Sequence, residues 1–72
     1  MAISSRERVK HWRELRGLSQ EELGERCGMT QYKISRIETG ATEASADDIE
    51  AIATKGLDLS MPEFYGAEEK AS

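Results

Sequence analysis

Apolar residues recur at helical spacing along the chain, separated by short polar turns. Val9, Trp12 and Leu15 lie three residues apart, so they are expected to form one stripe on a helix. The later stripes are Leu23 with Cys27, Ile34 with Ile37, and Ile49 with Ile52 and Ala53. No segment alternates strictly between apolar and polar residues, as a half-buried strand would. The pattern therefore predicts an all-α protein.

A Ser or Thr precedes each predicted helix, and a Gly follows it. A hydroxyl at the N-cap accepts hydrogen bonds from unpaired N–H groups of the first turn, and Gly can close a helix in the left-handed conformation. The pairs are Ser4 or Ser5 with Gly17, Ser19 with Gly28, Thr30 with Gly40, Ser45 with Gly56, and Ser60 with Gly66. These limits predict five helices, near residues 5–16, 20–27, 31–39, 46–55 and 61–65.

The second and third predicted helices carry the residues that a close crossing requires. Two short helices joined by a tight turn need a very small residue in the first, a Gly at the turn and apolar residues pointing inward from the second. Gly24 and Gly28 meet the first two needs. Met29, Ile34 and Ile37 meet the third. This arrangement predicts a helix-turn-helix motif.

Residues 17–40 read GLSQEELGERCGMTQYKISRIETG. They resemble the phage Cro and repressor type of helix-turn-helix family, also called the xenobiotic-response-element type, whose pattern is G-x-S-Q-x-x-L-A-x-x-x-G-x-S/T-x-x-x-I-S-x-I-E-x-G. The resemblance extends over about residues 6–65. It implies a compact five-helix, lambda-repressor-like DNA-binding domain, usually dimeric, whose recognition helix at about residues 31–39 enters the major groove.

Two Gln positions of the family fall on Gln20 and Gln31. By resemblance, the first contacts a backbone phosphate and touches the second, which reads a base. Gln suits adenine because its amide offers one donor and one acceptor to N7 and N6. The alternative is that both are simply exposed polar residues at helix N-termini.

The remaining candidate contacts lie on the outward side and edges of the recognition helix, because Ile34 and Ile37 point to the core. Arg36 can donate to guanine O6 and N7, and Tyr32 can pack on a thymine methyl group or bond a phosphate. The other polar side chains of this helix suit contacts with the DNA backbone. The alternative is that this basic face is only exposed to solvent. The candidate DNA-binding residues are Gln20, Gln31, Tyr32, Lys33, Ser35, Arg36 and Thr42.

Two further pairs of residues have expected structural roles. By resemblance, Arg13 and Glu38 form an ion pair that ties the first helix to the end of the third. Phe64 and Tyr65 are candidates for a homodimer interface, since a chain of this size gains stability from association and a two-fold operator needs two recognition helices. Completion of the subunit's own core is the alternative for both.

The chain departs from the family pattern at two places. After Gly40 the family commonly carries basic residues that hold phosphates, but this loop reads ATEAS, and Glu43 tends to repel DNA. We therefore expect modest affinity with a shallow salt dependence. Residues 52–57 form a run that is one residue longer than usual, which leaves the docking of residues 60–65 open.

Charge is distributed unevenly between the two parts of the chain. Residues 1–40 carry eight basic and six acidic side chains, a net +2, whereas residues 41–72 carry two basic and eight acidic ones, a net −6. This asymmetry suggests two faces with different partners. An alternative function is therefore a protein-interaction module, antitoxin-like or polymerase-contacting, that uses its acidic C-terminal half.

Length and composition argue against most other classes. The 72 residues allow one domain, expected at 1–66, with a short flexible tail at 67–72. A lone Cys27 cannot form an internal disulfide, and one Cys with one His cannot complete a zinc site. We also find no nucleophile–base pair or phosphate-binding Gly loop, so we expect no enzyme activity, metal or cofactor.

The sequence shows no apolar segment long enough for a signal peptide or a membrane span, which predicts a cytoplasmic protein. The family resemblance implies a bacterial or phage-encoded protein that associates with the nucleoid. We expect a sequence-specific regulator of transcription, a repressor or autoregulator, that binds an inverted repeat in double-stranded DNA as a homodimer.

Overall fold

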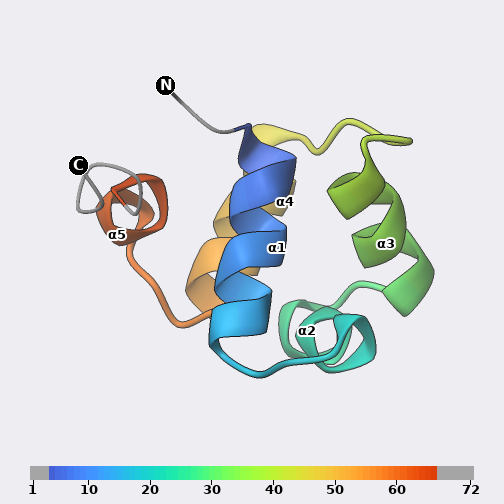
Figure 1. Ribbon diagram of the computed structural model, residues 1–72, viewed down its shortest axis with the longest axis horizontal. Helices are drawn as coiled ribbons and strands as arrows, with labels where there is room; N and C mark the ends of the chain where they lie inside the picture. The colour runs from blue at the N-terminus through green and yellow to red at the C-terminus, as the bar shows by residue number, and fades with distance from the viewer. Residues whose placement is uncertain (1–3, 67–72) are drawn as a thin grey trace.

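The computed structural model describes residues 4–66, and this part of the chain is helical with no strand (Figure 1). The elements are α1 (Ser5–Leu15), α2 (Gln20–Cys27), α3 (Gln31–Thr39), α4 (Ala46–Glu50), the π-helix η1 (Ala51–Gly56) and α5 (Met61–Tyr65). The predicted all-α, five-helix fold is confirmed. The proposed tail at 67–72 lies outside the described residues. Within residues 4–66, no helix is both long enough and apolar enough to cross a membrane.

Each α-helix begins at a hydroxyl N-cap, as the sequence predicts. Ser4, Ser19, Thr30, Ser45 and Ser60 all accept a hydrogen bond from the backbone N–H three residues later. At Ser19 the bond is reciprocal, because its own backbone N–H donates to Glu22 at 2.8 Å. That bond lowers the pKa of Glu22 below its ordinary value. Local sequence therefore sets where these helices start.

The buried core draws side chains from every helix. Its members are Val9, Leu23, Ile34, Ile37, Ile49, Ile52, Ala53, Leu57, Leu59 and Phe64. Trp12 is partly buried against this cluster, but Leu15 is 66% exposed. The expectation for Leu15 was wrong because six residues advance a helix by about 600°, which turns Leu15 roughly 120° away from Val9.

The C-terminal end of α5 is fastened to α1 by two side chains. Arg8 donates from Nη1 to the carbonyl oxygen of Tyr65 at 2.8 Å, and Trp12 donates from Nε1 to that of Phe64 at 3.1 Å. These bonds satisfy carbonyls that a helix end leaves unpaired, and a cation there also suits the helix dipole. Arg8 is only 5% exposed, a burial that sequence analysis missed. Its spacing of four residues from Trp12, which places both on one side of α1, was the available signal.

The two aromatic residues of α5 lie in different environments within the subunit. The Phe64 ring is completely buried in the subunit's own core, so it does not form the exposed dimer contact suggested by the sequence. Tyr65 is 42% exposed, and its ring lies 5.4 Å from the guanidinium carbon of Arg8. Of the two, only Tyr65 offers its ring to a partner.

The predicted helix at 46–55 is two elements, because the α-helix widens into a π-helix at Ala51. The backbone N–H of Leu57 donates to Ile52 five residues earlier, and that of Leu59 donates to Ala53 six residues earlier, both at 2.8 Å. A π-turn holds one more residue than an α-turn. It thus absorbs the extra residue noted in this run and brings Leu57 and Leu59 into the core.

The predicted glycine stops hold for three helices and fail for two. Gly17, Gly28 and Gly40 have positive φ. Gly56 and Gly66 do not, and Asp58, with φ 56°, supplies the left-handed residue after η1. Gly56 serves packing instead, because a Cβ there would lie 2.5 Å from Cδ1 of Leu23.

We predict that deleting Thr54 preserves the fold. Thr54 is exposed on η1, and its removal converts a π-turn into an α-turn while the flanking core residues keep their facing. The free energy of unfolding, measured by urea denaturation, should stay within about 1 kcal/mol of the wild type, as for other surface changes.

Deleting the exposed Lys10 from α1 is the matched control. Because α1 is a regular α-helix, this deletion rotates every later residue of the helix by about 100° and removes Trp12 and Arg13 from their partners. It should abolish cooperative unfolding. Equal damage from the two deletions would show that η1 does not accommodate an extra residue.

Candidate nucleic-acid interface

α2 and α3 form the predicted helix-turn-helix (Figure 1). Their crossing is too close for any side chain at Gly24. A Cβ on Gly24 would lie 2.5 Å from the carbonyl oxygen of Met29, which is a backbone atom. The chain reverses at Gly28, where φ is 76°, and the backbone N–H of Met29 donates to Gly24 at 2.8 Å. These contacts set the angle at which α3 leaves the turn.

A line of hydrogen bonds runs from α1 across α2 to the start of α3. Arg13 donates to Glu38 from Nε at 2.7 Å and from Nη2 at 3.1 Å, so the expected ion pair is present. Gln20 donates from Nε2 to the same carboxylate at 3.1 Å. Gln31 donates from Nε2 to Oε1 of Gln20 at 2.9 Å. The Gln–Gln contact expected from the family resemblance is thus part of a longer relay.

The relay determines how the two amides are oriented. An ionised carboxylate only accepts hydrogen bonds, so Gln20 turns its NH₂ group toward Glu38 and its oxygen toward Gln31. Gln31 must then donate to Gln20. The relay does not use the oxygen or the second amide hydrogen of Gln31, which is an exposed residue. One acceptor and one donor therefore remain at the first turn of α3.

A second group of contacts holds Arg36. Its Nε donates to Oγ1 of Thr42 at 2.9 Å, and its Nη1 donates to the hydroxyl of Tyr32 at 3.1 Å. The guanidinium carbon also lies 5.3 Å from the centre of the Tyr32 ring, within cation–π range. Tyr32 itself is 67% exposed. The structure thus gathers three candidate DNA-binding residues into one cluster.

Two other candidates lie at the margins of this face. Lys33 turns toward α4, where its Nζ lies 3.3 Å from Oδ1 of Asp48. Burial acts to raise the pKa of Asp48, but hydrogen bonds from Ser45 and Lys33 hold that pKa below its ordinary value. Ser35 is half-buried, one helical turn after Gln31. Lys33 has a competing protein partner that the sequence did not reveal.

Other chemistry is sparse in the described part of the chain. Residues 4–66 contain no group of three or more His, Cys, Asp or Glu side chains placed to hold a metal ion. Cys27 is half-buried, its Sγ donates to the carbonyl oxygen of Leu23 at 3.1 Å, and burial raises the pKa of its thiol. A reactive cysteine requires the opposite shift.

Comparison with known proteins agrees with this geometry. The family model described as a helix-turn-helix domain matches residues 6–60. The chain belongs to this family. No curated protein sequence matches it significantly.

Solved structures of regulators superpose closely on the chain. The wild-type restriction-modification controller protein C.Esp1396I is 27% identical, with a TM-score of 0.83 over 92% of this chain and 84% of the controller. A triclinic crystal form of that controller is 28% identical, with a TM-score of 0.80 over 90% of this chain and 83% of the controller.

The SinR protein/SinI protein complex contains a chain that is 23% identical, with a TM-score of 0.71 over 96% of this chain and 67% of the other. At that identity the likeness concerns the fold alone. Together the family and the neighbours confirm the Cro and repressor type of helix-turn-helix. This helix-turn-helix protein is a DNA-binding regulator of transcription.

We predict that Arg13→Ala lowers both stability and DNA affinity. The Glu38 side chain is 3% exposed, so removal of Arg13 leaves a buried carboxylate without its cation. By comparison with other buried ion pairs that lose one partner, the free energy of unfolding should fall by about 3 kcal/mol. Both glutamines lose their fixed orientation as well, so binding falls.

Arg16→Ala is the matched control, since it removes the same charge from an exposed position three residues later. Its effect on stability should be about 0.5 kcal/mol or less. Thermal melting and DNA titration on both variants give the comparison. Lost binding with an unchanged melting temperature in Arg13→Ala would refute the structural role of the pair.

Proposed function

We propose that this helix-turn-helix protein binds an inverted-repeat operator as a homodimer, with α3 in the major groove, and represses transcription, including that of its own gene. The outward side of α3 is the observation that carries the proposal. Gln31, Tyr32 and Arg36 reach solvent there, yet hydrogen bonds hold each of them. Side chains held in this way lose less conformational entropy when they bind a rigid partner.

Gln31 and Arg36 are the proposed base-reading residues. The free oxygen and amide hydrogen of Gln31 match the donor at N6 and the acceptor at N7 of adenine. Arg36 uses Nε and Nη1 for Thr42 and Tyr32, which leaves both N–H groups of Nη2 and one of Nη1 for O6 and N7 of guanine. Tyr32 and Thr42 thus orient Arg36 in the free protein.

The remaining polar residues are proposed to contact the DNA backbone. Gln20 retains an amide hydrogen for a phosphate beside the start of α2. Tyr32 and Ser35 lie within reach of the groove, and Tyr32 also offers its ring to a thymine methyl group. Lys33 contributes only if it exchanges Asp48 for a phosphate, which makes it the weakest member of the set.

The proposed dimer places Tyr65 at the interface between subunits. Its ring is exposed, and α5 is held rigidly on α1 by Arg8 and Trp12. A two-fold dimer on DNA sets its recognition helices about 34 Å apart, one turn of the duplex. The likeness to a restriction-modification controller supports a role in controlling gene expression.

A second candidate function is binding of a protein partner through the acidic C-terminal half. Residues 41–72 carry a net charge of −6, and acidic side chains at Asp47, Glu50, Asp58 and Glu63 are exposed. This surface would suit a basic partner, in the manner of an antitoxin or a polymerase-contacting protein. Partner binding through this surface is compatible with DNA binding by α3. If the protein does not bind DNA, partner binding would be its function.

We predict that selection from a random duplex library at low salt enriches an inverted repeat with the wild-type protein. The Gln31→Ala, Arg36→Ala double variant should enrich no sequence, because each bidentate base contact contributes about 1–3 kcal/mol of discrimination. Sequencing of the bound fraction provides the measurement.

Lys55→Ala, an exposed change on η1, is the control and should select the same repeat as the wild type. Enrichment of one identical repeat by wild type and double variant would overturn the assignment of the two reading residues. No enrichment by any of the three proteins would favour the partner-binding function.

We predict a shallow salt dependence of binding to the selected operator. The loop after Gly40 contains no Lys or Arg, so few phosphates are neutralised per subunit. A plot of log Kd against log salt concentration should have a slope of about 4, compared with about 10 for a protein with many phosphate contacts. A slope near the larger value would reveal a basic surface on the dimer that the subunit does not show.

A further inference from the structure

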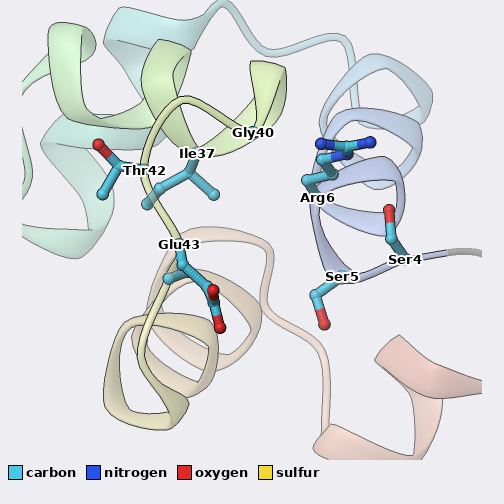
Figure 2. Close-up of a pocket in the computed structure, with 8 residues that line it drawn as sticks. Ser4, Ser5, Arg6, Ile37, Gly40, Thr42 and Glu43 are labelled. Atoms are coloured by element: carbon cyan, nitrogen blue, oxygen red, sulfur yellow. The ribbon is translucent and has the colours of Figure 1, made fainter.

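A cavity of about 330 Å³ lies between the start of α1 and the loop that joins α3 to α4 (Figure 2). Its lining mixes polar and apolar residues, and it includes one basic and one acidic side chain. The lining residues are Ser4, Ser5, Arg6, Ile37, Gly40, Thr42, Glu43 and Ala44. Two segments distant in sequence thus form one hollow beside the end of the recognition helix.

Arg6 lines this cavity, and its guanidinium lies beside Gly40. A Cβ on Gly40 would collide with Nη1 of Arg6, so the guanidinium occupies space that any other residue at position 40 would fill. Figure 2 shows Arg6 reaching from α1 toward the loop. Within residues 4–66, Arg6 is exposed and has no hydrogen bond or ion pair with another side chain, unlike the paired Arg8, Arg13 and Arg36. The charge of Arg6 is therefore available to a ligand.

The cavity borders the face of α3 that carries the proposed base contacts. Thr42 lines the cavity and also accepts the hydrogen bond from Nε of Arg36. The loop after Gly40 follows the C-terminal end of α3, so with α3 in the major groove this loop lies at the edge of the groove, beside the phosphate backbone.

We infer that Arg6 contacts a DNA phosphodiester at this edge of the groove and supplies the positive charge that the loop lacks. Residues 40–45 contain Glu43 and no Lys or Arg, so a cation at this edge has to come from another element. Arg6 is placed to do this because Gly40 leaves its guanidinium room beside the loop. The inference rests on the proposed insertion of α3 into the major groove.

Glu43 gives the inference a test by sign of charge. It lines the same cavity, so a phosphate held there feels attraction from Arg6 and repulsion from Glu43. Removal of the Arg6 charge should weaken DNA binding, and removal of the Glu43 charge should strengthen it. Both effects should be the same for specific and non-specific duplexes, because phosphate contacts carry no sequence information.

The experiment compares Arg6→Ala and Glu43→Gln with the wild type and with Lys55→Ala, which removes a positive charge from the exposed surface of η1. Binding to the selected operator and to a random duplex is titrated from 50 to 200 mM salt. Arg6→Ala should reduce the slope of log Kd against log salt by about 1 per subunit, as expected for one lost phosphate contact. Glu43→Gln should tighten binding to both duplexes, and Lys55→Ala should leave the slope unchanged.

An Arg6→Ala slope equal to that of Lys55→Ala, with wild-type binding intact, would overturn the inference and leave the proposed function standing. A failure of the wild type itself to bind the operator would instead overturn the proposed function. Thermal melting of Arg6→Ala should match the wild type because the side chain is exposed, so that a lower slope cannot be attributed to unfolding.

Discussion

The buried carboxylate of Glu38 is the point on which the DNA-facing half of the structure depends. It is nearly inaccessible to water, so its charge has to be compensated within the protein. Arg13 of α1 and Gln20 of α2 provide that compensation, which ties three helices to one group. The orientation of Gln31 then follows, because Gln20 uses its NH₂ group for the carboxylate and offers only its oxygen to Gln31, which therefore has to donate. A structural ion pair thereby sets the chemistry presented at the start of α3.

α1 connects this half to the other one (Figure 1). Arg13 on one side holds α3, whereas Arg8 and Trp12 hold the end of α5 through its backbone carbonyls. The helices that carry the proposed DNA contacts and the proposed dimer contact at Tyr65 are thus both held by α1. Such a connection suits a protein whose two recognition helices must match a fixed repeat of the duplex.

Electrostatics separate the two parts of the chain in a way that the net charge hides. The overall charge of −4 would oppose DNA binding if it were spread evenly. Acidic residues are instead concentrated after Gly40, and several arginines before it are occupied by protein partners. A hydrogen bond to Thr42 orients Arg36, whereas the guanidinium of Arg6 lies beside Gly40 without an ion-pair partner among residues 4–66. Arg36 on the outward side of α3 and Arg6 beside its C-terminal end are the cations proposed to meet DNA.

The sequence by itself determined the features that depend on near neighbours. Helix starts were predictable because an N-cap bonds a residue only three positions away, and the crossing of α2 and α3 was predictable from Gly24 and Gly28. The candidate set on α3 followed from the inward Ile residues together with the family resemblance. Periodicity failed at Leu15, where six residues exceed the width of one stripe.

Only the tertiary structure decided the features that join distant parts of the chain. Arg8 and the end of α5 are more than fifty residues apart, the Gln20 contact with Glu38 spans 18 residues, and the Lys33 contact with Asp48 spans 15. No local preference selects such partners, because each depends on how the helices pack and which polar groups that packing buries. The π-turn has the same origin. It appears because Leu57 has to face the core. With the extra residue in this segment, a regular α-helix would turn Leu57 away from the core, whereas the π-turn does not.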